Sequence, residues 1–404
     1  MPLYSYVARN PQGKTVSGKL EAANQSSVVK TLREQGLIPT SIQTGAVAMG
    51  GRTVRKRRGK PRIGDKVIFS RQMATMIRAG LPLIEVLDIL SEQSEKQSVC
   101  DIVKTVQKDV EAGASLTEAV QKHPRFFDTF FVSMIRTGEA SGMLDAILDQ
   151  IAIYLEKIAS IQRKVKSALA YPIMVSIVAT CITVFLLVKV VPVFEDIFAD
   201  LGGDLPIPTK ITLAVSAVIQ HYWWLVLMMI VAGVIALSWW YKTPNGRYVI
   251  DSYKIRMPVF GQLFLKMAIA RFARTFATLI RAGVNILLAL EIVSRTAQNA
   301  VLERAIENTK ISIQSGESLS RPLMDSGVFP PMVTRMIDVG ERTGALESML
   351  TKVAEFYEDQ VDAAVAALTS MIEPLLIVFL GLVIGFIVIS MFMPLFKMIE
   401  LVSH

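Results

Sequence analysis

Side chains that bind metals or carry nucleophilic chemistry are scarce in this sequence. Its 404 residues include 2 cysteines and 3 histidines. The histidines, His123, His221 and His404, lie in separate regions, so the sequence builds no histidine metal site or triad from them. Cys181 lies in an apolar segment and Cys100 outside it, so we expect reduced thiols and no disulfide. These absences argue against an enzyme, and we expect no catalytic residue, cofactor or metal.

Charged residues are missing from three long stretches. No Asp, Glu, Lys or Arg occurs in Ser167–Val188, Ile211–Tyr241 or Pro374–Phe396. A helix needs about 20 apolar residues to cross a bilayer, and a helix buried in a soluble core seldom stays free of charge for so long. The sequence therefore predicts three transmembrane helices, which we place at residues 167–191, 222–241 and 374–396.

The predicted spans also lack deeply placed carboxylate, Arg or His side chains, and Lys189 is near enough to one end to snorkel. Proton and ion pathways usually need such groups, so a small transporter is a remote alternative. The third span contains Gly381 and Gly385 in a GxxxG pattern, which favours close packing between membrane helices. The spans are typical of a scaffold.

Lys and Arg residues set the expected orientation. They occur before the first span at positions 157, 163, 164 and 166, and after the second at positions 242, 247, 254 and 256. The intervening residues 192–221 carry four acidic residues against Lys210. By the positive-inside rule we expect a cytoplasmic N-terminus without a signal peptide, and a short loop at 192–221 and a tail at 397–404 on the outer side of the membrane.

Residues 1–43 are expected to form a small α+β module. Residues 4–8 and 16–20 alternate between apolar and polar side chains on either side of a turn, which is typical of a β-hairpin. A short helix should follow, capped by Asn24 and stopped by Gly36, and a strand over Ile38–Ile42 should close the module.

Residues 44–62 form a basic linker. Seven of the positions from Arg52 to Arg62 are Lys or Arg, without an acidic residue. Such a block repels itself and stays extended in water, where it can lie near an anionic membrane surface. No aromatic residues interleave it, so we do not expect nucleic-acid binding, and the net charge of +8 fits the positive-inside bias.

One block of the remaining chain occurs twice. Phe69–Gly80 recurs as Phe272–Gly283 with the shared pattern Phe-x-Arg-x-x-Ala-Thr-x-Ile-Arg-Ala-Gly, and Gly138–Leu144 recurs as Gly340–Leu346. Neither copy shows a strand pattern. The fold class that follows is a mainly α membrane protein with two homologous cytoplasmic helical-bundle domains, at residues 63–166 and 257–373, and the small α+β module.

Local signals place several helices of the first copy. Asp65 is expected to cap the first helix, and Ser115 with Glu118 to form a capping box. The first helix should bury one face at helical spacing, made by Val67, Ile68, Met73, Ala74, Met76 and Ile77. The last helix of each copy, from Leu148 and from Leu350, should run directly into a membrane span.

The duplicated polar residues are the candidate contact sites. Arg78, Arg281, Glu139 and Glu341 recur at matched positions and could hold the bundles together or meet a partner. The matched glycines should serve turns and helix corners, at Gly80, Gly283, Gly138 and Gly340. Asp145 and Asp149 lie one helical turn apart and could share a divalent cation, but a solvated helix start is the favoured interpretation.

These residues resemble a known family, the inner-membrane platform proteins of type IV pilus and type II secretion machines, PilC and GspF. The resemblance rests on the doubled motif, the doubled Gly-Glu-x-x-Gly-x-Leu, the opening Tyr-x-Tyr-x-Ala-Arg, and Val191–Phe198 leading to Leu205–Thr209. It covers essentially the whole chain, and it implies a bacterial inner membrane, so that the loop at 192–221 and the tail at 397–404 are expected to be periplasmic.

The resemblance implies a platform without catalytic activity that couples a hexameric cytoplasmic assembly ATPase to pilin polymerisation and depolymerisation. It implies further partners: pilin or pseudopilin, other inner-membrane machine components, and copies of the chain in a dimer or tetramer. We favour the type IV pilus, with its twitching motility, over the equivalent type II secretion platform.

Overall fold

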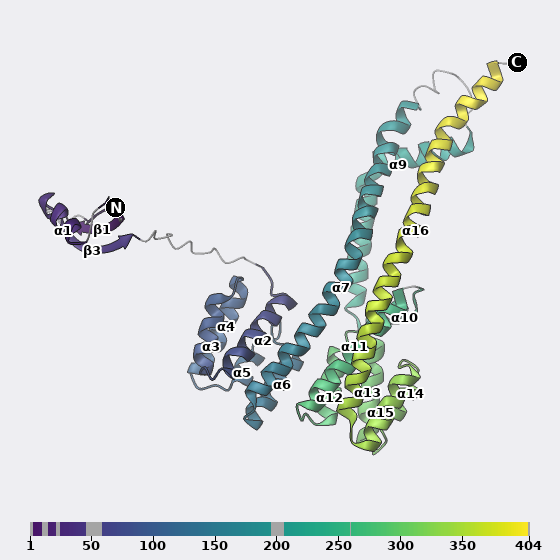
Figure 1. Ribbon diagram of the computed structural model, residues 1–404. Helices are drawn as coiled ribbons and strands as arrows, with labels where there is room; N and C mark the ends of the chain where they lie inside the picture. Colours follow the sequence, from purple (N-terminus) through teal and green to yellow (C-terminus); the bar gives the residue numbers. More distant parts are fainter. Residues whose placement is uncertain are drawn as a thin grey trace. The chain divides into compact units, whose positions relative to one another are not determined.

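The computed structural model describes residues 3–9, 15–21, 25–45, 59–194, 206–258 and 260–402. Within these ranges the chain forms a small sheet-and-helix unit followed by a much larger helical unit, which holds both copies of the repeat and all of the long apolar helices (Figure 1). The expected mainly α fold with a small α+β module is confirmed.

The N-terminal unit is a three-stranded antiparallel sheet with one helix. Strands β1 (Leu3–Arg9) and β2 (Thr15–Glu21) form the predicted hairpin, and β3 (Ile38–Gly45) pairs with the other edge of β1, giving the order β2-β1-β3. Helix α1 (Gln25–Glu34) packs on the sheet and buries Val28 and Leu32 with Ala8 of β1. β3 is longer than expected and takes in residues 44–45; the rest of the predicted linker up to residue 58 lies outside the described residues, as does Asn24.

The first repeat contains five helices that precede a sixth, much longer one: α2 (Ile63–Arg78), α3 (Leu83–Gln93), α4 (Gln97–Glu111), α5 (Leu116–Gln121), α6 (Thr129–Ser141) and α7 (Leu144–Phe185). The capping box at Ser115 and Glu118 is present, with the Ser115 hydroxyl accepting the backbone N–H of Glu118 at 3.1 Å.

The second repeat has the same order of helices: α11 (Phe260–Arg281), α12 (Ile286–Thr296), α13 (Ala300–Gln314), α14 (Ser320–Asp325), α15 (Pro331–Thr343) and α16 (Leu346–Val402). Matched aromatic contacts anchor the two bundles. Phe69 meets Phe127 with ring centroids 5.6 Å apart, and Phe272 meets Phe329 at 4.9 Å. The buried side chains of both bundles form one continuous hydrophobic core.

Two local predictions for α2 were wrong. The helix begins at Ile63, and Arg62 occupies the cap position, while the Asp65 carboxylate accepts the backbone N–H of Arg62 at 2.6 Å from inside the first turn. Ile68 is 59% exposed and Phe69 is buried in its place, whereas Met73 and Ala74 of the predicted face are buried as expected. The cap was misplaced because a sequence leaves the start of a helix uncertain by a few residues.

The long helices connect the bundles to the apolar part of the protein without interruption. α7 continues through Pro172 into a short π-helix, η1 (Leu186–Val190), and α16 continues through Pro374 and Pro394. α7 and α16 pack against each other (Figure 1). Among the described residues, three helices are long and apolar enough to cross a bilayer, within Leu144–Phe194, Ile207–Tyr241 and Leu346–Pro394.

The segment predicted as the loop at residues 192–221 is partly helical. α9 (Ile207–Tyr241) starts well before residue 222 and bends at Tyr222, whose φ of −117° and ψ of 18° depart from helical values. Its first part packs on the other apolar helices, with Ser216 Oγ donating to the carbonyl of Leu187 and Thr209 Oγ1 to that of Ser390, each at 2.5 Å. The prediction placed residues 207–221 in a loop because it counted charged residues, and a charge count does not detect packing between helices. Likewise, the expected tail from residue 397 continues α16 as far as Val402.

Candidate functional site

Glu139 and Glu341 each cap the start of a short helix in their own repeat. The Glu139 carboxylate, on α6, accepts the backbone N–H groups of Leu116 and Thr117 at 2.6 and 3.0 Å, where α5 begins. The Glu341 carboxylate, on α15, accepts the N–H of Leu319 at 2.9 and 3.0 Å, beside α14. Free N–H groups and the positive end of the helix dipole stabilise a carboxylate there. A docking partner that used either glutamate would displace these bonds.

Gly138 and Gly340 lie where the following long helix approaches closely. A Cβ atom on Gly340 would stand 2.9 Å from Cα of Leu346, and one on Gly138 would stand 3.1 Å from Cβ of Ile147. Real Cβ atoms need more room, so a side chain at either position would push α16 or α7 away. The two glycines let each repeat pack its long helix tightly at the corner.

Gly80 and Gly283 end α2 and α11 with φ angles of +85° and +78°. Glycine adopts this left-handed region without steric cost. Their N–H groups donate to the carbonyls of Ile77 and Ile280 at 2.9 and 3.0 Å, which closes the last turn of each helix. The geometry at both positions is that of a helix-ending turn.

Arg71 and Arg274, matched in the two copies, join the first helix of each repeat to its long helix. Arg71 donates to both oxygens of Glu156 on α7 at 2.6 and 2.7 Å, and to Asp149 at 2.8 Å. Arg274 donates to Glu358 on α16 at 2.7 Å, with both side chains largely buried. The hydrogen bond from Arg71 holds the pKa of the Glu156 carboxyl below its usual value, and the same bond raises the pKa of Arg71. These pairs fix α2 on α7 and α11 on α16.

Arg78 and Arg281 make a second pair of contacts on the same helix faces, two turns further along. Arg78 pairs with Asp149 at 2.7 Å, and Arg281 Nε donates to Glu347 at 2.8 Å. Asp149 thus accepts from two guanidinium groups, so its negative charge is already balanced by protein cations. No group of three or more His, Cys, Asp or Glu within the described ranges could hold a metal ion. This arrangement does not support the alternative that Asp145 and Asp149 share a divalent cation.

The two repeats contact each other along α7, α11 and α16. The Tyr154 hydroxyl on α7 lies 3.1 Å from Oγ1 of Thr275 on α11, in a buried hydrogen bond. Lys157 Nζ lies 3.9 Å from Glu358, and Lys164 Nζ 2.5 Å from Asp362. Burial raises the pKa of Tyr154 to about 12. No local sequence pattern predicts this contact, since Tyr154 and Thr275 lie in different copies of the repeat.

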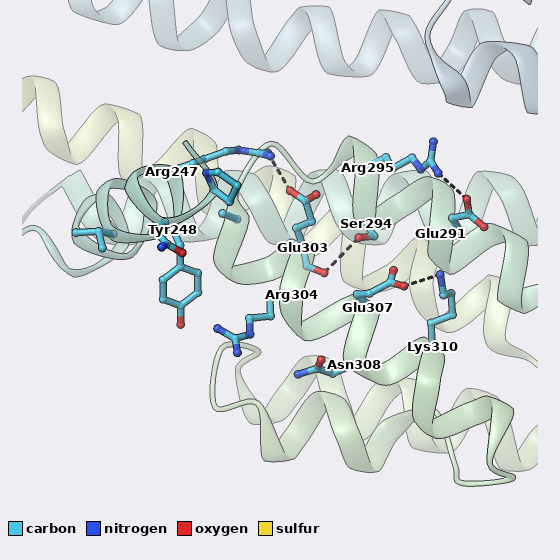
Figure 2. Close-up of a pocket in the computed structure, with 14 residues that line it drawn as sticks. Arg247, Tyr248, Glu291, Ser294, Arg295, Glu303, Arg304, Glu307, Asn308 and Lys310 are labelled. Carbon is cyan, nitrogen blue, oxygen red and sulfur yellow. Dashed lines mark hydrogen bonds and ion pairs between the residues drawn. The ribbon is translucent and has the colours of Figure 1, made fainter. Parts of the chain in front are cut away.

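A charged groove of about 670 Å³ lies on the second repeat, between α12, α13 and α10 (Pro244–Arg256) (Figure 2). Three ion pairs line it: Arg247 with Glu303 at 2.9 Å, Arg295 with Glu291 at 2.9 Å, and Lys310 with Glu307 at 2.6 Å. Arg304 lies over the Tyr248 ring, 5.6 Å from its centroid. The alternating charges of the groove could contact a polar protein surface. The sequence analysis did not predict the groove because its residues come from three helices.

An apolar groove of about 750 Å³ runs between the membrane segments of α7, α9 and α16. Gly381 and Gly385, the predicted packing glycines, both line it, and no atom of the described chain lies within 4 Å of the position a Cβ would take on either. Their packing partner is thus not found within the described chain.

Comparison with known proteins identifies the duplicated unit. A family model described as "Type II secretion system (T2SS), protein F" matches twice, at residues 69–192 and 272–394, and the model of its N-terminal domain matches residues 1–43. The chain belongs to this family. Each match runs from the second turn of α2, or from the equivalent part of α11, into the membrane segment of the long helix, so the family unit is a helical bundle together with its membrane helix.

Full-length relatives carry two kinds of name. The chain is 45% identical to "Type IV pilus assembly protein PilC" of Thermus thermophilus over 406 residues, covering 100% of both chains. It is 42% identical to the PilC of Myxococcus xanthus, covering 98% of this chain and 94% of the relative. It is 33% identical to "Type II secretion system protein F" of Xanthomonas campestris, covering 98% of this chain and 99% of the relative.

Proposed function

We propose that this chain is the inner-membrane platform of a type IV pilus assembly machine, where it couples a cytoplasmic assembly ATPase to pilin polymerisation and depolymerisation. The observation that carries the proposal is the 45% identity to a pilus assembly protein over the full length of both chains. The equivalent platform of a type II secretion system is the second candidate, supported by the 33% identity to a relative with that name.

The continuity of α7 and α16 supports a mechanical role. Each helix starts at a bundle corner held by a glycine and by Arg–carboxylate pairs, and each continues through a candidate membrane span. A helix keeps its backbone hydrogen bonds along its length, so a displacement at the bundle end moves the membrane end as well. A platform that transmits force between the two compartments needs such a connection, and it needs no catalytic group.

The proposed partners follow from where the free surfaces lie. The guanidinium groups of Arg78 and Arg281 stay 57% and 53% exposed although each is paired, so they remain candidates for contact with the ATPase. The open face at Gly381 and Gly385 is a candidate contact for a membrane helix of pilin or of another copy of the chain in a dimer or tetramer.

We also propose that the N-terminal unit and both repeats lie in the cytoplasm and that the chain ends in the periplasm. The basic residues next to the first two spans support this orientation. The test uses a variant without the two native cysteines and a membrane-impermeant thiol reagent on intact cells. A cysteine in place of Glu317, on the exposed surface of the second repeat, should react only after lysis, and one in place of Ile207, which is 75% exposed, should react before it. Labelling of the Glu317 variant in intact cells would reverse the proposal.

The pilus role itself is tested by deleting the gene and restoring it on a plasmid. Surface pili and twitching motility should disappear in the deletion strain and return on complementation, while secreted proteins stay unchanged. Loss of secretion with intact pili would move the protein to the secretion machine. Affinity purification of the full chain from gently solubilised membranes should retain an assembly ATPase, and its consistent absence would count against the coupling role.

A further inference from the structure

A polar cavity of about 340 Å³ lies at the junction of the two repeats. Four cationic side chains line it, Arg62 and Lys66 from the first repeat and Arg271 and Arg295 from the second, together with one carboxylate, that of Asp128. The cavity is thus formed by both copies of the duplicated unit, and its lining carries more positive than negative charge.

Two of the four cations are already paired. Lys66 Nζ lies 3.1 Å from the Asp128 carboxylate, whose other oxygen accepts the backbone N–H of Phe131 at 3.0 Å. Arg295 pairs with Glu291 at 2.9 Å. The excess positive charge of the cavity is therefore contributed by Arg62 and Arg271.

Arg271 is partly buried, and no described residue gives it a carboxylate partner. Burial lowers the pKa of its guanidinium, which means that the surroundings disfavour the charge. A guanidinium has five N–H donors, and within the described ranges the only hydrogen bond that this one makes is from Nη1 to the side-chain oxygen of Gln298. Buried charges in proteins are normally paired, so this cation lacks its usual counterion.

Gln298, the residue that accepts from Arg271, has an unusual backbone. Its φ of +52° is the only positive value among the described non-glycine residues. The left-handed region is sterically unfavourable for a residue with a side chain. The turn between α12 and α13 thus holds a strained conformation that places the Gln298 amide at the cavity, next to Arg271.

The duplication is broken at this junction. The position matched to Arg271 in the first copy is Ile68, which is 59% exposed. Tyr154, which also lines the cavity, is matched by Phe356 in the second copy. Arg271 and Tyr154 therefore have no equivalent in the other copy. This is expected of residues that serve a single site formed between the two copies.

We propose that this cavity binds a phosphoryl anion, held mainly by Arg271 and Arg62 and contacted from both repeats. The planar guanidinium fork matches the oxygen spacing of phosphate and can donate two bonds to it. A water molecule occupies about 30 Å³ of liquid, so the volume suits a phosphate group carrying a substituent of moderate size. Since the anion would contact both copies, its binding would stabilise one arrangement of the two repeats. This inference does not rest on the proposed pilus role.

The experiment uses the full chain in phosphatidylcholine nanodiscs and equilibrium dialysis with radiolabelled inorganic phosphate at constant ionic strength. Wild type should bind phosphate saturably, at about one site per chain. Arg271→Gln should weaken binding by about tenfold or more, since hydrogen bonds to charged groups are the strong ones. Arg62→Gln changes an exposed side chain, should leave the fold intact and should weaken binding by a smaller factor. Arg304→Gln changes a residue of the groove in Figure 2 that does not line the cavity, so it is the matched control and should bind like wild type.

Competition identifies the source of the phosphoryl group. Displacement of the label by AMP at concentrations below those needed with phosphate would identify a nucleotide, displacement in nanodiscs containing phosphatidylglycerol would identify a lipid headgroup, and phosphate binding resistant to both would identify the free ion. Each result supports the site. The proposal is overturned if wild type binds no phosphate saturably, or if Arg271→Gln and Arg62→Gln, both folded by circular dichroism, bind as wild type does.

Discussion

Tyr154 of the first repeat donates a buried hydrogen bond to Thr275 of the second, across the junction of the two copies. The direction follows from the neighbouring contacts, because the Thr275 hydroxyl already donates to the backbone oxygen of Arg271 at 2.7 Å. The oxygens of Tyr154 and Thr275 are 3.1 Å apart. This bond ties together two domains that descend from one duplicated unit, although neither residue is repeated in the other copy.

Removing this hydrogen bond should loosen the repeat junction. Tyr154→Phe should lower the free energy of unfolding by about 1 kcal/mol, and Thr275→Val should add little more once Tyr154 is gone, since both changes remove one interaction. Denaturant unfolding of the four-membered cycle in detergent measures the coupling. Thr278→Val is the control, because Thr278 makes the same kind of helix bond, to the oxygen of Arg274 at 2.7 Å, without meeting Tyr154. Additive effects of Tyr154→Phe and Thr275→Val would contradict the prediction.

The same tyrosine should make stability depend on alkaline pH. Burial raises the pKa of Tyr154 to about 12, above the ordinary tyrosine value of 10.0. The unfolded chain therefore loses this proton first, so the stabilisation is complete below about pH 10 and declines as the pH rises toward 12. The slope attributable to this group is at most about 1.4 kcal/mol per pH unit. The free energy of unfolding, measured between pH 9 and pH 11, should decline less steeply for Tyr154→Phe than for wild type. Equal slopes would contradict a raised pKa of Tyr154.

The two capping glutamates should matter for folding before they matter for partners. Glu139→Gln and Glu341→Gln should each cost about 1–2 kcal/mol, because the charge at the helix start is lost and the remaining amide is a poorer acceptor. Glu92→Gln, at an exposed position in α3, is the matched control and should be near neutral. If the Glu139 and Glu341 variants unfold like wild type yet no longer retain the assembly ATPase, a docking role would replace the structural one.

The corner glycines should tolerate no side chain. Gly340→Ala brings a methyl group within 2.9 Å of the backbone of Leu346, and the required shift of α16 should cost about 1–3 kcal/mol. Gly64→Ala is the control, since a Cβ at Gly64 would meet no atom within 4 Å and its backbone is helical. That change should be neutral or slightly stabilising. Thermal unfolding compares the two, and similar melting temperatures would rule out the close approach.

The glycines of the third span should affect association and leave folding of the single chain unchanged. Gly381→Leu and Gly385→Leu add side chains at the apolar groove, where a Cβ at either position would meet no other described helix within 4 Å, so unfolding should change little. If another helix packs there, crosslinking between copies or to pilin, and pilus assembly, should fall several-fold. Leu382→Ile, on the same helix, is the control. Wild-type assembly by both leucine variants would remove this face from the interaction surface.

The sequence by itself determined the features that depend on short-range pattern. The duplication, the three apolar helices, the N-terminal hairpin and the Ser115 capping box were all predicted, because periodicity and composition act within a few turns of chain. The close approach at Gly138 and Gly340 could be anticipated too, since a glycine repeated at a predicted helix corner is most simply explained by backbone geometry.

Only the tertiary structure decided what each polar side chain contacts. Glu139 reaches a helix more than twenty residues away in sequence, at Leu116, and Arg271 faces a cavity that residues of both repeats line. α9 begins at Ile207 because its first turns are held by bonds to other helices. Such contacts depend on how helices pack, and packing joins positions that no local pattern connects. For that reason the helices and their duplication could be predicted from the sequence, whereas the partner of each charged side chain is determined by the tertiary structure.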